Sequence, residues 1–263
     1  MSGSENGAGG RAGASAGTLP RLAVLPSEAL PGAAAAEIAR VLAGAVQTRG
    51  IAHWATTGGS AAPGIYAALR EAPLRDVVDW TCVHTWWGDD RFVPADHPLS
   101  NVMPIAGMPM PDANLHPILA GEAIALGESP AWAAARYEAE LAAAVPADAH
   151  GTPVLDLVIL GVGPDGHILS VFPGSAVWDE PAQVCAVPAP THIEPHVARV
   201  TIHPRLVAAA RAVLVIAAGA SKAANLGRAW TGDDVRELPV RAARLGTATW
   251  FLDEAAAAEL PRG

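Results

Sequence analysis

A histidine and an aspartate stand two residues apart in the stretch LGVGPDGHILSVFPG, residues 160–174. Three glycines of the same stretch follow an apolar run and spell G-x-G-x-x-G, the pattern of dinucleotide-binding loops. Two chemistries are therefore open. The glycines could hold a pyrophosphate, or they could form a tight turn that presents Asp165 and His167 to a substrate.

The dinucleotide interpretation fails in its local context. The pattern requires a helix that opens among the glycines and crosses back to a parallel strand. The FPG at 172–174 stops any helix after a few residues, and the next strand-like run, 183–187, ends before a proline where an acidic ribose ligand is expected. We therefore interpret the glycines as turn residues.

His167 then becomes a candidate general base. A neutral imidazole takes up and returns a proton near neutral pH, and Asp165 can stay beside it or face the same cavity. The alternative is a histidine that only caps the loop. We expect no metal site here, because the sequence places no cluster of further ligand-type residues next to His167.

A glycine loop and an arginine could bind an anion. In TTGGSAAP, Gly58 and Gly59 allow a ligand close to the backbone, and Ser60 stands at an expected helix start, where free N–H groups bind phosphate or carboxylate. An ordinary glycine turn is the alternative. In WWGDDRFVPADHPLSN (86–101), Arg91 either pairs with the aspartates before it on the surface or grips an anionic substrate.

The chain has a single lysine among its 17 lysine and arginine residues, Lys222, just after an apolar run. Because the sequence otherwise uses arginine for surface charge, this lysine indicates a chemical requirement at its position. The alternative is a lysine retained there by chance. A compact ammonium beside a helix start fits a phosphate. Arg199, in HVARVTI, is a second candidate cation, although arginines in strands often serve sheet edges.

Strand-like and helical segments alternate, which predicts an α/β fold with a mostly parallel sheet and helices on both faces. In such sheets ligands bind at the carboxyl ends of the strands, where these loops fall. Strands are expected at 21–25, 51–56, 80–87, 154–161, 183–187, 196–202, 211–219 and 248–253. Helices are expected at 27–47 and 129–145, with Ser27 and Ser129 as N-caps, and at 61–70, 221–232 and after 253, with a proline-rich connection over 93–118.

Composition narrows the classes of protein. The 263 residues are 51% hydrophobic, and we expect one α/β domain over 19–263 after a disordered, Gly/Ala/Ser-rich tail over 1–18. A net charge of −9 disfavours nucleic acid and anionic membranes as partners. No apolar run or signal peptide indicates membrane insertion or export, so a cytoplasmic location is expected, with Cys82 and Cys185 as buried thiols.

Four segments taken together resemble the 6-phosphogluconolactonase family. The family's SGGS-type loop, WGDERFVP…SN stretch, GPDGHTASLFPG loop and late G…K junction correspond here to TTGGS (56–60), WGDDRFVPADHPLSN (87–101), GPDGHILSVFPG (163–174) and GASKA (219–223). Order and spacing agree from about residue 21 to 253. The departures are Asp90 for Glu, Ile168–Leu169–Ser170 for TAS, and Ala61–Ala62 for Thr-Pro, which removes a hydroxyl from the glycine loop.

The resemblance implies a Rossmann-like fold and hydrolysis of 6-phospho-D-glucono-1,5-lactone to 6-phospho-D-gluconate, the second step of the oxidative pentose phosphate pathway. It implies no redox cofactor and no required metal. His167 would activate water, and Asp165 would orient the His167 imidazole or hold a sugar hydroxyl. Arg91 would stabilise the oxyanion or the product carboxylate. The 6-phosphate would be held by Gly58, Gly59, Ser60 and Lys222, with Arg199.

Other activities stay open on the same fold. A glucosamine-6-phosphate deaminase shares a D-G-H loop, but the resemblance to it is weaker at RFVP and SVFPG. A non-catalytic phosphosugar sensor would keep the glycine loop and Lys222 but lose the histidine, whereas His167 and Asp165 are both present. The expected partner is a small phosphosugar lactone, bound by a monomer or a weak homo-oligomer.

Overall fold

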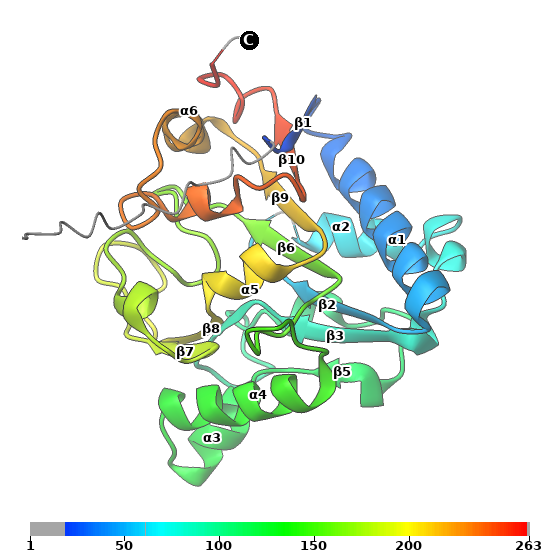
Figure 1. Ribbon diagram of the computed structural model, residues 1–263, viewed down its shortest axis with the longest axis vertical. Coiled ribbons are helices and arrows are strands. Elements are labelled where there is room, and N and C mark those ends of the chain that lie inside the picture. The colour runs from blue at the N-terminus through cyan, green and yellow to red at the C-terminus, as the bar shows by residue number, and fades with distance from the viewer. Residues whose placement is uncertain (1–18, 61, 262–263) are drawn as a thin grey trace, which may run out of the picture.

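The computed structural model describes residues 19–60 and 62–261, so the tail expected over 1–18 lies outside the described residues. A seven-stranded sheet runs through it in the order β1-β10-β9-β6-β2-β3-β5, and each strand is parallel to its neighbours (Figure 1). The parallel α/β fold is thereby confirmed. The strands are β1 (Arg21–Leu25), β2 (Ala52–Thr56), β3 (Val83–Trp87), β5 (Leu115–His116), β6 (Leu157–Gly161), β9 (Val213–Ala217) and β10 (Ala248–Asp253).

Two segments expected as strands pair elsewhere. β7 (Val184–Val187) and β8 (Arg199–Ile202) form a separate antiparallel sheet with β4 (Asp89–Arg91), in the order β4-β8-β7. The connection between β7 and β8, residues 188–198, contains no helix, whereas the crossover that joins a parallel pair is usually helical. This small sheet brings the segment after β3 against the segment around Arg199.

Helices cover both faces of the large sheet. Figure 1 shows α1 and α2 on one side of it and α5 and α6 on the other. The helices are α1 (Leu30–Arg49), α2 (Ala62–Leu69), α3 (Ala120–Leu126), α4 (Pro130–Ala144), α5 (Pro204–Ala209) and α6 (Ala223–Thr231). The short helices α3 and α5 were not expected from the sequence.

The two predicted helix caps have different outcomes. Ser129 caps α4 as predicted, because its side chain accepts a hydrogen bond from the backbone N–H of Trp132. Ser27 does not cap α1, which begins at Leu30, and its hydroxyl instead donates to Asp253 Oδ2 at 2.7 Å. The helix expected after residue 253 is also wrong, since turns follow β10 through residue 260.

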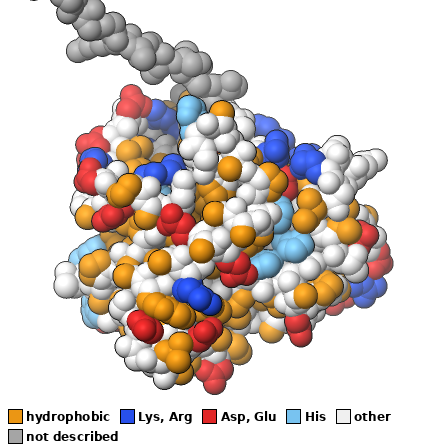
Figure 2. All heavy atoms as spheres, turned by 60° about the horizontal axis from the view of Figure 1, so that its bottom comes forward, with side chains coloured by type: hydrophobic (Ala, Val, Ile, Leu, Met, Phe, Trp, Pro, Cys, Tyr) orange, Lys and Arg blue, Asp and Glu red, His pale blue; other side chains and the backbone are white. Residues whose placement is uncertain are grey.

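Both cysteines are free thiols, with Cys185 buried and Cys82 half-buried, so the expected burial holds fully for Cys185 only. Among the described helices, none combines the length and apolar character needed to cross a membrane. On the face drawn in Figure 2, acidic and basic side chains are scattered among one another. The face drawn there therefore carries no broad patch of one charge sign.

Candidate active site

Three neighbouring strands direct their loops to one cleft. β9, β6 and β2 lie side by side in the sheet, and because they are parallel their carboxyl ends meet at one edge. The loops that follow them join β4 and β8 to line a cavity of about 230 Å³. Its lining includes Gly58, Gly59, Ser60, Arg91, His167, Arg199 and Lys222, which are all the predicted site residues except Asp165.

Asp165 lies behind His167 rather than in the lining. His167 Nδ1 is 2.5 Å from Asp165 Oδ1, and the His167 side chain is only 16% exposed. Because a carboxylate accepts hydrogen bonds, this contact places the proton of a neutral imidazole on Nδ1 and leaves Nε2 free to accept one. Burial opposes ionisation of Asp165, but the hydrogen bond and the charge of His167 outweigh it and lower the pKa of Asp165.

The backbone of the turn fits closely around this pair. A Cβ on Gly163 would lie 2.0 Å from His167 Nδ1, so only glycine permits the imidazole to fold back over the chain. The Gly163 N–H donates to the His167 carbonyl at 2.9 Å, and the Gly166 N–H donates to the Gly163 carbonyl at 3.0 Å. Gly163 and Gly166 thus act as turn residues, as the sequence predicted, whereas Gly161 is the last residue of strand β6.

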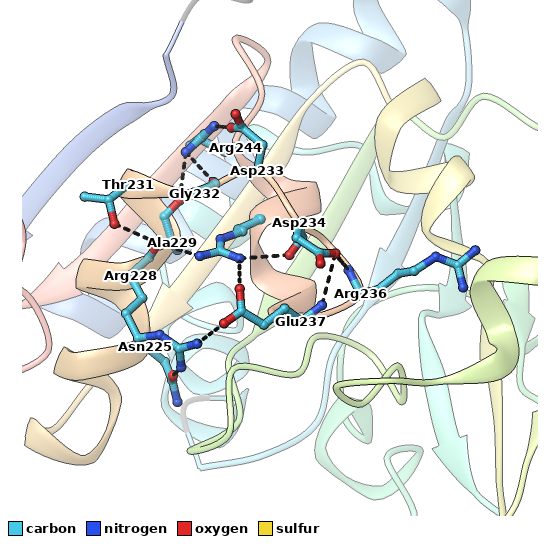
Figure 3. A network of polar contacts seen from close by, with 11 residues as sticks. Asn225, Arg228, Ala229, Thr231, Gly232, Asp233, Asp234, Arg236, Glu237 and Arg244 are labelled. Atoms are coloured by element: carbon cyan, nitrogen blue, oxygen red, sulfur yellow. Dashed lines mark hydrogen bonds and ion pairs between the residues drawn. The ribbon is translucent and has the colours of Figure 1, made fainter.

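A polar network outside the cleft anchors the same turn. Asn225 Nδ2 donates to the Pro164 carbonyl at 2.7 Å, while Asn225 Oδ1 accepts from Arg228. Figure 3 shows how Arg228 continues to Glu237. Glu237 also pairs with Arg241. The histidine turn is therefore held from the side of α6 as well as by its own hydrogen bonds.

Arg91 and Arg199 face each other across the small sheet. They are register partners in the β4–β8 pair, and Arg199 is 3% exposed. Arg91 Nη1 donates to the Leu99 carbonyl at 2.7 Å and Arg199 Nη2 to the Pro195 carbonyl at 3.2 Å. Within residues 19–60 and 62–261 neither makes an ion pair, and both Nε atoms are buried without a hydrogen-bond partner.

Burial lowers the pKa of Arg199, and the nearby charge of Arg91 acts in the same direction against the opposing charges of Asp89 and Asp165. The Arg199 guanidinium also lies 5.3 Å from the centre of the Phe172 ring. Two adjacent cations, one buried and one half-buried, whose donors are incompletely used, form a site suited to an anion. The surface ion pair that the sequence left open for Arg91 is not formed with Asp89 or Asp90.

Lys222 enters the cleft from the end of β9. It closes a single 3₁₀ turn, Ala220–Lys222, that leads into α6. Burial lowers the pKa of Lys222, and the charge of Asp165 opposes this shift. The Gly219 N–H before the turn donates to both carboxylate oxygens of Asp253 at 3.0 Å. Asp253, at the carboxyl end of β10, therefore fixes the backbone that carries Lys222.

Asn101 closes the glycine loop, a contact that the motifs did not assign. A Cβ on Gly58 would lie 1.8 Å from Asn101 Oδ1, so the amide packs directly on the glycine backbone. Asn101 Nδ2 donates to the Asp89 carbonyl at 2.9 Å, and the buried Ser170 hydroxyl donates to Asp89 Oδ2. Asp89 and Asn101 both line the cleft. Both belong to the 87–101 segment that carries the family resemblance, but the sequence analysis assigned no role to either.

His192 is the residue that sequence reasoning missed entirely. Its Nε2 lies 2.9 Å from Asp165 Oδ2, so Asp165 has a histidine on each oxygen. The spacing of His192 and His196 resembles a metal-binding pair, but their segment is not helical and His196 instead pairs with Glu194. Across the described part of the chain, no group of three or more His, Cys, Asp or Glu residues is arranged to hold a metal ion.

Comparison with known proteins identifies the family to which this chain is similar. Residues 26–251 match the family model of glucosamine-6-phosphate isomerases/6-phosphogluconolactonase. A 6-phosphogluconolactonase of Streptomyces coelicolor is 36% identical over 246 residues, covering 89% of this chain and 92% of the relative. One of Mycobacterium leprae is 33% identical over 242 residues, covering 89% of this chain and 96% of the relative.

Solved structures extend the comparison to the fold. The 6-phosphogluconolactonase of Trypanosoma cruzi superposes with a TM-score of 0.81 at 26% identity, covering 94% of this chain and all of that one. A monomeric glucosamine-6-phosphate deaminase, at 18% identity and a TM-score of 0.73, shares the fold over 91% of this chain and 99% of its own. With a family model that matches most of its length and relatives above 30% identity, the chain belongs to the glucosamine-6-phosphate isomerase/6-phosphogluconolactonase family.

Proposed function

We propose that this protein hydrolyses 6-phospho-D-glucono-1,5-lactone to 6-phospho-D-gluconate. The observation that carries the proposal is an oriented His167–Asp165 pair at a cleft whose three cations, Arg91, Arg199 and Lys222, make no ion pair among the described residues. A base beside unpaired positive charge suits an anionic substrate that reacts with water. Relatives that carry the name 6-phosphogluconolactonase cover most of the chain, which supports the same reaction.

The first step is attack of water on the lactone carbonyl carbon. His167 Nε2 takes one proton from the water as its oxygen bonds to that carbon, and the carbonyl oxygen becomes an oxyanion. Arg91 and backbone N–H groups of the cleft stabilise this developing charge. Asp165 holds the imidazole by Nδ1 and stabilises it when it is protonated. Both Asp165 oxygens are occupied by histidines, which supports this orienting role over contact with a sugar hydroxyl.

The second step opens the ring. The oxyanion re-forms a carbonyl, the bond from the carbonyl carbon to the ring oxygen breaks, and His167 returns its proton to that oxygen. The product is a carboxylic acid that ionises in water. Throughout, we assign the 6-phosphate to Lys222 and the loop of Gly58, Gly59 and Ser60. Arg199, beside Arg91 in the small sheet, contributes to binding of the same phosphate.

We propose that residues 19–263 act as one α/β domain on a small phosphosugar lactone, as a monomer or weak homo-oligomer in the cytoplasm. The free thiols of Cys82 and Cys185 are in keeping with a reducing compartment.

The test follows hydrolysis of freshly made lactone against its spontaneous rate. Glucose-6-phosphate dehydrogenase generates the lactone, and 6-phosphogluconate dehydrogenase detects the product. We expect acceleration by the wild type and a fall in kcat of about 10²- to 10⁴-fold in His167→Ala, while the control His150→Ala, on an exposed turn, stays near wild type. No acceleration over background by the folded protein contradicts the proposal, and ammonia release from glucosamine 6-phosphate would favour a deaminase.

A further inference from the structure

Asp165 sits between two histidines that belong to different segments. Its Oδ1 is 2.5 Å from His167 Nδ1 and its Oδ2 is 2.9 Å from His192 Nε2. His192 comes from the connection between β7 and β8, and its side chain is 49% exposed against 16% for His167. Both rings pack on Phe172, with centroids 4.7 Å and 5.5 Å from it. His192 is therefore linked to the reacting histidine by hydrogen bonds through the shared carboxylate and by packing on the shared Phe172 ring.

We propose that His192 is a positioning residue that, through Asp165, sets the orientation and the basicity of His167. The inference rests on the proposed role of His167 as the general base. A carboxylate that accepts a hydrogen bond on each oxygen cannot rotate without breaking one of them, so the donor on Oδ2 keeps Oδ1 on His167. His192 also joins the wall of the cleft to the reacting turn, since Ile193 and Glu194 line the cavity.

The charge state of His192 also acts on His167 through Asp165. A neutral His192 donates an N–H and leaves the full charge of Asp165 to stabilise protonated His167. A protonated His192 adds a positive charge across the same carboxylate and opposes protonation of His167. Because the two histidines share one carboxylate, the charge on one acts on the other.

The other charges near this pair are few. The charge of Asp165 also acts on Arg199 and Lys222, from β8 and the turn before α6. On the His192 segment itself, Glu194 and His196 pair with each other at 3.0 Å. Because those groups stay in place when His192 is replaced, the change in coupling is assigned to His192.

Two substitutions separate the hydrogen bond from the charge. His192→Gln keeps an N–H donor for Asp165 but carries no titratable charge, whereas His192→Ala removes both. His150→Gln is the matched control, because His150 is an exposed histidine on the turn before β6 and outside the cleft. Circular dichroism and thermal unfolding first establish that each full-length variant is folded.

The pH dependence of kcat/KM and of kcat is then measured on the lactone. In His192→Gln we expect the acidic limb to move to higher pH by about half a unit to one unit, with kcat at the plateau within about twofold of wild type. In His192→Ala we expect the same shift together with a fall in plateau kcat of about three- to tenfold, because Asp165 is less restrained. Profiles of both variants that match wild type and the His150→Gln control overturn the inference.

A readout without turnover separates this inference from the proposed function. The ring Cε1–H signals of His167 and His192 are followed by NMR through a pH titration of the substrate-free protein, and assigned with the single variants. Coupled, biphasic shifts of His167 that become monophasic in His192→Gln support the inference even if the lactone proves not to be the substrate. A single unperturbed transition of His167 in both proteins overturns it even if the lactone is hydrolysed.

Discussion

Two buried aspartates, Asp156 and Asp90, lie at opposite ends of the sheet and have different partners. Asp156, 4% exposed, precedes β6 at the amino ends of the strands, where Arg49 lies 2.7 Å and Arg211 3.4 Å from its Oδ1. Its Oδ2 accepts the N–H of His53 at 2.8 Å. The amino end thus neutralises its buried carboxylate with two cations.

The cleft end keeps its charges apart. Asp90, 2% exposed, accepts hydrogen bonds from the Arg91 N–H at 2.8 Å, the Asn101 N–H at 2.6 Å and the Ser100 hydroxyl at 2.9 Å. All three donors are neutral, and burial raises the pKa of Asp90 to about 6. The guanidinium of the next residue, Arg91, turns to the Leu99 carbonyl instead. Charges are paired where they stabilise the fold and unpaired where a ligand is expected.

The largest expected effect comes from exchanging one arginine at each end for methionine. Arg199→Met should lower kcat/KM by about 10²- to 10³-fold, because the substrate loses a desolvated cation. Its free energy of unfolding should stay within about 1 kcal/mol of wild type, since a buried cation without an ion pair among the described residues adds little stability. Steady-state kinetics and urea unfolding of the same preparations measure both.

Arg211→Met is the matched control at the amino end. The Arg211 Nε atom lies 3.4 Å from Asp156 Oδ1, and the Arg211 side chain is 49% exposed. We therefore expect this variant to lose about 0.5 to 1 kcal/mol of stability and to keep kcat/KM within about twofold of wild type. The contrast between the two ends would fail if Arg199→Met destabilised the protein by several kcal/mol while the folded fraction kept normal kinetics.

The two aspartates should also affect the pH dependence of the free energy of unfolding in different ways. The pKa of Asp90 is about 6 in the folded protein, against an ordinary value of 3.8. As pH rises from about 4 to about 6, the unfolded chain releases this proton while the folded chain retains it, so the stabilising contribution present at low pH is lost. Asp90→Asn should therefore gain stability relative to wild type over this window, by about 2 to 3 kcal/mol at most.

Asp156→Asn should behave in the opposite way. It keeps an acceptor for the His53 N–H but loses both ion pairs, so we expect a loss of about 1 to 2 kcal/mol at pH 7. Urea unfolding of both variants and wild type at pH 4, 5, 6 and 7 provides the comparison. A difference between Asp90→Asn and wild type that does not change across these pH values would mean that Asp90 carries no burial cost.

The sequence predicted those parts of the molecule that depend on local patterns. The run at 213–217 is apolar at every position, as a strand covered on both faces must be, and the lone Lys222 marked the loop after it. Strand β4 could not be recognised, because its three residues Asp89–Arg91 are charged and become a strand only by pairing with β8. The antiparallel sheet that places Arg199 beside Arg91 was hidden for this reason.

Long-range side-chain contacts account for the remaining differences. Ser27 looked like a helix cap, but its hydroxyl is taken by Asp253, 226 residues away. The alanine-rich segment after β10 looked helical, yet the Asp253 carboxylate accepts the N–H of Ala256 and turns the chain. His192 reaches Asp165 across 27 residues, and its own neighbours carry no sign of that contact. Such pairs are set by the fold and leave little trace in local sequence.

The smallest expected effect is the stabilisation of the folded protein by bound phosphate, which tests whether the cleft cations are free to bind an anion. If the cleft cations are free for an anion, inorganic phosphate should bind the folded state and stabilise it by mass action. At about ten times its dissociation constant, phosphate should add about 1.4 kcal/mol, a rise of about 3 to 6 °C in Tm for a chain of this size.

The two ends of the sheet provide the controls for this last measurement. Lys222→Met and Arg199→Met remove cations that line the cleft, so each should reduce the rise in Tm, whereas Arg211→Met should retain it because Arg211 lies outside the cleft. Sodium chloride at equal ionic strength corrects for screening of the net charge of −9. An equal rise in all four proteins would place phosphate elsewhere on the surface, and the unpaired cleft charges would then need another explanation than anion binding.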